Sequence, residues 1–105
     1  MKNILVIDDE IDICNNIKAI LTDEGFNIQV AHNSDDAFNY IKKHSYNLII
    51  LDVWLDDSKY DGLEILKEIR KNLTIPIIII SGHGNIEMAV SAIKDGANEF
   101  IEKPF

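Results

Sequence analysis

The chain has 105 residues, which is enough for one modest globular domain and too few for two. Hydrophobic residues make up 47% and charged residues 27% of the sequence, a balance typical of a folded protein rather than a disordered one. The formal net charge of -8 argues against direct binding of nucleic acid, because a polyanion would be repelled. No signal peptide precedes the first apolar run and no run is long enough to span a membrane, so we expect a cytoplasmic location.

Five short apolar runs are typical of β-strands. The first, third and fourth are continuous, as in strands that are buried on both faces, and the second alternates like a strand nearer an edge. The last run is short. The expected strands cover residues 4–7, 26–31, 48–51, 77–80 and 99–101.

Four stretches of helical period alternate with these runs. The expected helices lie between Ile13 and Gly25, over Ser34–Lys43 with a cap at Asn33 or Ser34, from Leu63 to Leu73, and from the cap Asn85 to Gly96. Apolar residues recur at helical spacing in the first and third stretches, at Ile13, Ile17, Ile20 and Leu21 and at Leu63, Leu66, Ile69 and Leu73. In the second and fourth stretches we expect the apolar residues to point inward; these are Ala37, Phe38 and Ile41, and Ala89, Ala92 and Ile93. The single cysteine, Cys14, excludes an internal disulfide and is interpreted as a core residue of the first helix.

Strict alternation of strands and helices predicts βαβ crossovers and a parallel sheet. Three strands that are apolar on both faces require helices on both sides of that sheet, which makes the fold class a doubly wound α/β sandwich. No helix follows the last strand. We therefore expect one face of the sheet to be poorly covered near that edge, as in a domain cut short.

Polar residues follow four of the five expected strands. Ligands of an open parallel sheet bind beyond the carboxyl ends of its strands, so these residues should meet at one edge. They are Asp8, Asp9 and Glu10 after the first strand, Asp52 after the third, Ser81 and Gly82 after the fourth, and Lys103 and Pro104 after the fifth. Clustered carboxylates suit Mg²⁺, and a lysine and a serine can bind a phosphate group beside it. A carboxylate nucleophile in that setting predicts an acyl-phosphate site.

Each of these groups also has a simpler interpretation. The acidic run at residues 8–10 could cap the first helix, Asp52 and Ser81 could belong to turns, and Lys103 could be a solvated surface residue. Their joint placement at four strand ends favours a functional site.

The same residues, in this order, resemble the receiver domain of response regulators in two-component systems. The resemblance rests on ILVIDDE at residues 4–10, Leu51-Asp52, Ser81-Gly82 and Lys103-Pro104, and it covers residues 1–105. It implies a flavodoxin-like sheet of order 2-1-3-4-5 whose fifth helix is missing here. By position, it implies Asp52 as the phosphoacceptor; Asp8, Asp9, Asp52 and the backbone carbonyl of Trp54 as the Mg²⁺ site; Ser81 and Lys103 as phosphate-binding residues; Phe100 as an aromatic switch; and a cis bond before Pro104.

The resemblance also implies a function. The domain would take a phosphoryl group from a histidine kinase and catalyse only its own phosphorylation and dephosphorylation. It could form a homodimer through the fourth helix and fifth strand, and it would bind neither membrane nor nucleic acid itself. Residues 81–105 are most similar to regulators of the NtrC and NtrX type, which usually join the receiver to an ATPase domain and a DNA-binding domain. The long loop 52–62, which lacks the usual proline, favours the NtrX type.

Two other functions compete with this interpretation. A phosphohydrolase of the haloacid dehalogenase type also uses an aspartyl nucleophile and Mg²⁺, but it needs a second aspartate two residues later, where Trp54 stands. The chain could instead be an interaction module that does not depend on phosphorylation. The complete set of site residues weighs against that module.

Overall fold

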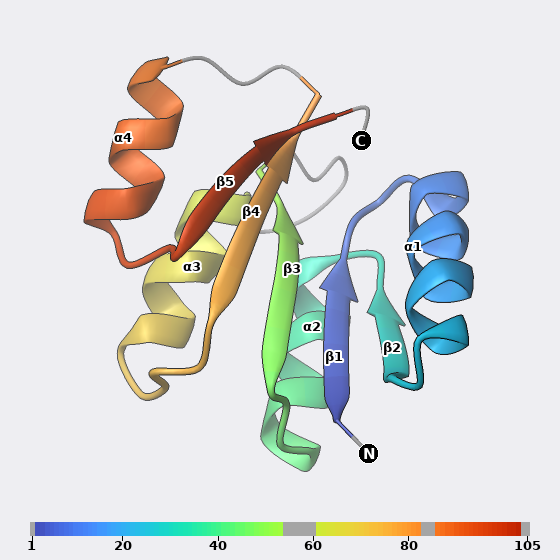
Figure 1. Ribbon diagram of the computed structural model, residues 1–105. Helices are drawn as coiled ribbons and strands as arrows, with labels where there is room; N and C mark the ends of the chain where they lie inside the picture. The colour runs from blue at the N-terminus through green and yellow to red at the C-terminus, as the bar shows by residue number, and fades with distance from the viewer. Residues whose placement is uncertain (1, 54–60, 83–85, 104–105) are drawn as a thin grey trace.

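The protein is described by a computed structural model in which residues 2–53, 61–82 and 86–103 are placed. Within them, one parallel sheet has the strand order β2-β1-β3-β4-β5, which confirms the predicted flavodoxin-like fold. All strands point toward the same end of the molecule (Figure 1). The strands are β1 Asn3–Ile7, β2 Asn27–Ala31, β3 Leu48–Asp52, β4 Ile77–Ser81 and β5 Glu99–Glu102.

Helices connect these strands at the predicted places. In the described residues they are α1 Ile11–Asp23, α2 Ser34–Lys43, α3 Gly62–Arg70 and α4 Ile86–Lys94. Asn33 is the cap of α2, since its Oδ1 accepts a hydrogen bond of 2.8 Å from the backbone N–H of Asp36. The chain turns away after α1 at Gly25, whose φ of +94° is accessible to glycine at little cost.

One detail of the predicted helices differs, and another is not tested. α3 ends at Arg70, so the prediction that Leu73 lies on that helix is wrong. The backbone N–H of Leu73 still donates to the carbonyl of Ile69 at 3.0 Å, in a turn that continues the helical spacing for a few residues. The predicted cap of the fourth helix, Asn85, lies outside the described residues.

Helices cover the two faces of the sheet unequally. The larger core lies on one face, where α2, α3 and α4 contribute Ala37, Ile65, Leu66, Ile69 and Ala92. The smaller core lies under α1, which contributes Cys14 and Ile17 against β1. A single described helix therefore covers the second face.

An apolar groove of about 250 Å³ marks the uncovered part of that face, as the sequence predicts. It lies between α1 and the strands β3, β4 and β5, and it is lined by Ile17, Ile20, Leu21, Ile50, Ile78, Ile80 and Ile101. Ile20, which the helical spacing groups with the apolar residues of α1, is 63% exposed, because no described element packs on the far side of the groove.

α4 also differs from its predicted packing. Of its apolar residues only Ala92 is fully buried, and the prediction that Ile93 points inward is wrong, because Ile93 is 49% exposed. The helix stands at the β5 edge of the sheet and packs against β5 (Figure 1). Ile86 and Val90 are exposed on the same helix. None of the helices in the described part of the chain is long and apolar enough to cross a membrane.

Candidate functional site

The strand register brings the predicted site residues to one edge of the sheet. Ile7 is paired with Leu51, so Asp8 and Asp52 follow neighbouring positions on β1 and β3. On the other side, the backbone N–H of Lys103 donates to the carbonyl of Ser81 at 2.8 Å, which fixes the end of β5 beside the end of β4. The carboxyl ends of four strands therefore assemble the predicted cluster.

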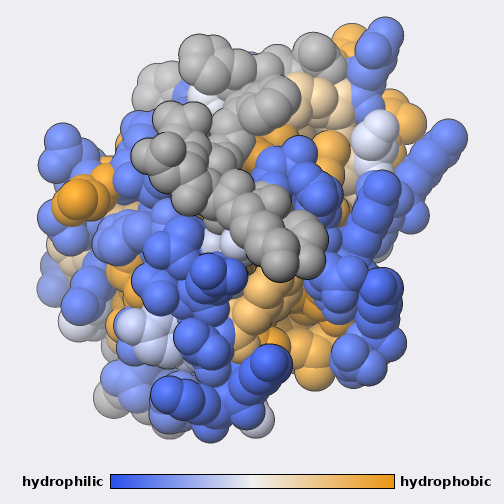
Figure 2. All heavy atoms as spheres, turned by 180° about the vertical axis from the view of Figure 1, so that it is seen from behind, coloured by the Kyte–Doolittle hydropathy of each residue, from blue (hydrophilic) through white to orange (hydrophobic). Residues whose placement is uncertain are grey.

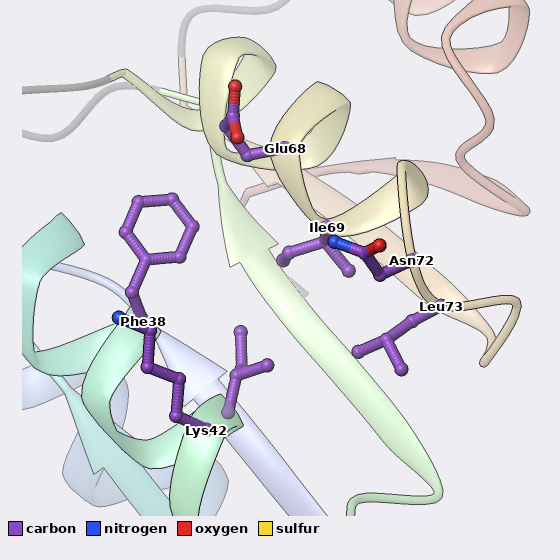
Figure 3. A pocket seen from close by; sticks show the side chains of 7 residues that line it. Phe38, Lys42, Glu68, Ile69, Asn72 and Leu73 are labelled. Atoms are coloured by element: carbon purple, nitrogen blue, oxygen red, sulfur yellow. The ribbon is translucent and has the colours of Figure 1, made fainter.

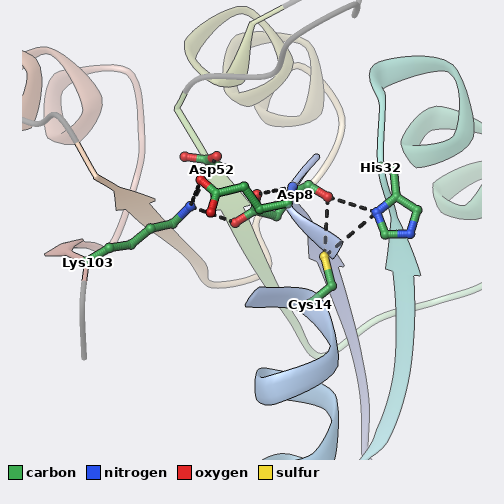
Figure 4. Close-up of polar contacts among 6 residues, drawn as sticks. Asp8, Cys14, His32, Asp52 and Lys103 are labelled. Atoms are coloured by element: carbon green, nitrogen blue, oxygen red, sulfur yellow. Dashed lines mark hydrogen bonds and ion pairs between the residues drawn. The ribbon is translucent and has the colours of Figure 1, made fainter. Parts of the chain in front are cut away.

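The ammonium group of Lys103 reaches the carboxylates of this cluster from the β5 side (Figure 4). Its Nζ lies 2.9 Å from Oδ2 of Asp8, 3.3 Å from Oε1 of Glu10 and 3.4 Å from Oδ2 of Asp52. The side chains of Lys103, Asp8 and Asp52 are 9%, 0% and 4% exposed, respectively. The interpretation of Lys103 as a solvated surface lysine is therefore wrong.

Opposing effects act on the ammonium group of Lys103. Burial by itself would lower its pKa, but the close contact with Asp8 and the charges of Asp52, Asp8 and Glu10 together raise that pKa above the ordinary value. Lys103 thus stays protonated throughout the neutral range. It is available as a fixed positive charge for an anionic group at this edge.

The carboxylates outnumber the cation that compensates them. One oxygen each of Asp8, Glu10 and Asp52 lie within 4.8 Å of one another. Asp8 Oδ1 accepts a hydrogen bond of 2.9 Å from the N–H of Glu10, whereas its buried Oδ2 has the ion pair with Lys103 but no hydrogen bond of good geometry within the described residues. Buried carboxylates in this arrangement call for a further cation. A hard oxygen donor set suits the predicted Mg²⁺.

The remaining predicted site residues are placed as follows. Ser81 is fully buried at the end of β4, and Phe100 on β5 is half-buried against the larger core. Asp9 is half-buried next to Asp8, and its role as a direct metal ligand stays a prediction. The predictions for the Trp54 carbonyl and the bond before Pro104 fall outside the described residues.

Glu10 belongs to the site although the sequence did not single it out from the acidic run. Its carboxylate approaches both Lys103 and the two aspartates. Its position at the N-cap of α1 indicates this role. The Glu10 side chain makes no capping hydrogen bond there, whereas the Asn33 side chain caps α2. Glu10 thus occupies the N-cap position, as the simpler interpretation of the acidic run expected, but its carboxylate makes no capping hydrogen bond.

Cys14 and His32 contact the backbone of Asp8 on the side away from Lys103 (Figure 4). The Cys14 thiol donates to the backbone carbonyl of Asp8 at 3.2 Å, and Nδ1 of His32 lies 3.0 Å from the same oxygen. Burial, followed by the charge of Asp8, raises the pKa of Cys14 to about 12. The predicted core position of Cys14 is confirmed.

A larger groove of about 500 Å³ separates α2 from α3 and shares no residue with the carboxylate cluster. From behind, apolar atoms are visible between the charged helices (Figure 2). Phe38 and Lys42 on one wall face Glu68 and Ile69 on the other (Figure 3). This groove brings together no set of groups with evident chemistry.

An acidic edge on a 2-1-3-4-5 sheet is the arrangement that the resemblance to the receiver class implies. The chain matches the response regulator receiver domain over residues 4–105 and belongs to that family, whose members are not enzymes in the ordinary sense.

Several of the relatives that it resembles are of the NtrX type. The chain is 51% identical over 98% of its length to the nitrogen assimilation regulatory protein NtrX of Azorhizobium caulinodans, of which it spans only 23%. It superimposes on the crystal structure of the receiver domain of NtrX from Brucella abortus with a TM-score of 0.91 and 50% identity, covering 97% of this chain and 86% of that one. The solution structure of the beryllofluoride-activated NtrC4 receiver domain dimer gives a TM-score of 0.92 and 42% identity, covering 100% and 86%.

Proposed function

We propose that the chain is a phosphoacceptor switch in which Asp52 receives a phosphoryl group from the phosphohistidine of a sensor kinase. The observation that carries the proposal is the position of Asp52: it ends β3 with its carboxylate beside Lys103 and Asp8. A buried carboxylate held next to a permanent cation is suited to attack an electrophilic phosphorus.

The transfer exchanges one bond to phosphorus for another. An oxygen of Asp52 attacks the phosphorus, an acyl-phosphate bond forms, and the bond to the imidazole nitrogen of the kinase breaks, with a proton returned to that nitrogen. A magnesium ion held by Asp8, Asp9, Asp52 and the Trp54 carbonyl would neutralise charge on the phosphoryl oxygens. Lys103 exchanges its contact with Asp52 for a phosphoryl oxygen, and the Ser81 hydroxyl donates to another.

We further propose that this local change alters the face formed by α4 and β5. Ser81 and Lys103 are joined by one backbone hydrogen bond, and Phe100 lies on β5, the strand that leads directly to Lys103. α4 exposes the apolar residues Ile86, Val90 and Ile93, which suit a homodimer contact. The similar NtrC4 receiver domain forms a dimer in its beryllofluoride-activated state. A coupling of about 1–3 kcal/mol between phosphorylation and this face is enough for a switch.

The domain would control a transcription-activating output region inside the cell. Support comes from the NtrX relative, which is named as a regulatory protein and extends far beyond the matched part. Residues 1–105 would then be a receiver domain without its last helix, and the apolar groove beside α1 marks where further structure would pack.

Intact-mass spectrometry tests the phosphoacceptor proposal. The protein is incubated with acetyl phosphate, with and without Mg²⁺, beside an Asp52→Asn variant whose fold is checked by circular dichroism. We expect a single phosphate adduct that requires both Mg²⁺ and Asp52. A folded protein that forms no adduct would point instead to an interaction module that does not depend on phosphorylation.

Phe100→Ala tests the switch separately from the chemistry. This variant should form the same adduct but show smaller phosphorylation-dependent changes in the amide NMR signals of α4. Equal loss of the adduct and of the response would contradict the assigned role of Phe100.

A further inference from the structure

Glu10 combines two separable contacts in the site. Its backbone N–H donates to Oδ1 of Asp8, while its side-chain carboxylate lies 3.3 Å from Nζ of Lys103. The carboxylate is 60% exposed, in contrast to the buried Asp8 and Asp52. A substitution of the side chain can therefore remove its charge and leave the backbone contact in place.

The carboxylate of Glu10 has no capping hydrogen bond, although it occupies the N-cap of α1. Glutamate is not among the residues that cap helices well. The side chain thus makes no capping contact in the helix, and its carboxylate instead accepts a hydrogen bond from the ammonium group of Lys103. This indicates a role directed at the lysine.

Lys103 competes with any divalent cation for the buried aspartates. Its Nζ is in contact with both Asp8 and Asp52, the two carboxylates that would hold the metal. A third, exposed carboxylate offers the ammonium group an alternative partner on the solvent side. An ammonium group drawn toward that partner leaves the inner oxygens accessible to the metal.

We propose that Glu10 is a positioning residue that draws Lys103 away from Asp8 and Asp52 and thereby strengthens Mg²⁺ binding. The proposal rests on the proposed function, because it assumes that these aspartates bind Mg²⁺. Glu10 shares the ammonium group of Lys103 with the two aspartates and weakens their hold on it, until a phosphoryl group becomes the lysine's anionic partner. It acts through Lys103 rather than as a metal ligand.

A double-mutant cycle tests this role with Mg²⁺ affinity as the readout. Mg²⁺ is titrated while the fluorescence of Trp54, the single tryptophan, is followed in the protein and in Glu10→Gln, Lys103→Met and the double variant. Glu10→Gln should weaken Mg²⁺ binding by about fivefold, the size expected for one partly exposed carboxylate. In the Lys103→Met background the same substitution should have a much smaller effect, because no lysine remains to be repositioned.

Two controls make the outcome specific. Glu24→Gln removes the same charge at the opposite end of α1, and it should change the affinity by less than about twofold. Lys103→Gln replaces Lys103→Met where the latter does not fold, since its amide can still donate to the carboxylates.

Different results overturn different claims. An effect of Glu10→Gln that is equal in both backgrounds would show that Glu10 acts directly on the metal, and no effect would remove it from the site; either overturns the inference. Failure of the unmodified protein to bind Mg²⁺ or to form the phosphate adduct would instead overturn the proposed function.

Discussion

At the scale of single residues, the Cys14 thiol shows how tightly the back of the site is closed. It is fully buried and donates to the backbone of Asp8. Its pKa is raised from 9.0 to about 12, so the thiolate that alkylating reagents attack is scarce at neutral pH. We expect iodoacetamide to label Cys14 much more slowly in the folded protein than in urea.

The same pKa predicts how stability depends on pH. An unfolded Cys14 ionises above pH 9, while the folded one keeps its proton until about pH 12. Unfolding therefore releases a proton in this range, and stability falls as pH rises. Between pH 8 and pH 10 the loss should be about 1 kcal/mol. Urea unfolding of the protein and of Cys14→Ala at both pH values isolates this contribution, and an equal pH dependence in both proteins would contradict it.

Sequence reasoning was most successful for residues at strand ends. The order of the strands puts Asp8, Asp52, Ser81 and Lys103 at one edge, whatever the side-chain details. It could not find the contact between Glu10 and Lys103, because that contact depends on the direction of a side chain at the first turn of α1. Periodicity also could not show that Ile20 and Ile93 are exposed, since both were placed by spacing alone.

At the scale of elements, Gly62 allows α3 to begin directly against the end of β3. A Cβ at this position would lie 2.6 Å from the Cα of Val53 and would overlap the carbonyl of Asp52. The N–H of Gly62 also donates to the carbonyl of Val53 at 2.8 Å. The close approach needs a residue without a side chain.

Gly62→Ala should therefore displace the backbone that carries the phosphoacceptor. We expect a loss of about 1–3 kcal/mol in the free energy of unfolding and slower formation of the acetyl-phosphate adduct. The matched control is Gly82→Ala, where an added Cβ meets only Cδ of Lys103, at 3.8 Å. Equal stability of the two variants would argue against the close packing at Gly62.

Arg70 joins three elements at the opposite end of the sheet. Its guanidinium donates to the backbone carbonyls of Leu73, Ile75 and Gly96 and, at 2.8 Å, to Oδ1 of Asn98. That oxygen also accepts the N–H of Ile77 at 2.9 Å. The sequence could not reveal this network, since its members come from α3, the turn after it and the connection from α4 to β5.

Arg70→Met should lower the free energy of unfolding by about 2–3 kcal/mol, because several carbonyls lose a charged donor together. Arg70→Lys should retain only a small part of the stability that Arg70→Met loses, since an ammonium group lacks the planar geometry by which a guanidinium serves several diverging acceptors. Guanidinium unfolding curves of the three proteins give the comparison. A full rescue by lysine would mean that charge alone, and not geometry, is needed at this position.

At the scale of the whole molecule, the apolar groove beside α1 exposes aliphatic side chains on a sheet face. Exposed contiguous apolar surface promotes association in water. We expect the protein to bind an apolar dye such as ANS and to self-associate at high concentration. Sedimentation velocity over a concentration series, together with dye fluorescence, measures both effects.

The variant Ile20→Lys/Ile101→Lys places two charges at the groove and should reduce both dye binding and association. Ile86→Lys, on the exposed side of α4, is the control for a surface elsewhere and should leave dye binding in the groove unchanged. If the variant with lysines at the groove still binds the dye fully, the apolar surface that binds the dye lies elsewhere. The uncovered face itself was predictable, because the sequence shows no helical stretch after the last strand.

The strand order also has a consequence for how the molecule folds. β1 and β3 are neighbours in the sheet, although α1, β2 and α2 lie between them in the chain. Pairing of such distant segments is slow, because closing the long loop between them costs chain entropy before any stabilising contact forms. Asp8 meets Asp52 only when that pairing is complete. A nascent or partly folded chain therefore presents isolated aspartates, and the acidic edge itself reports that the central sheet has formed.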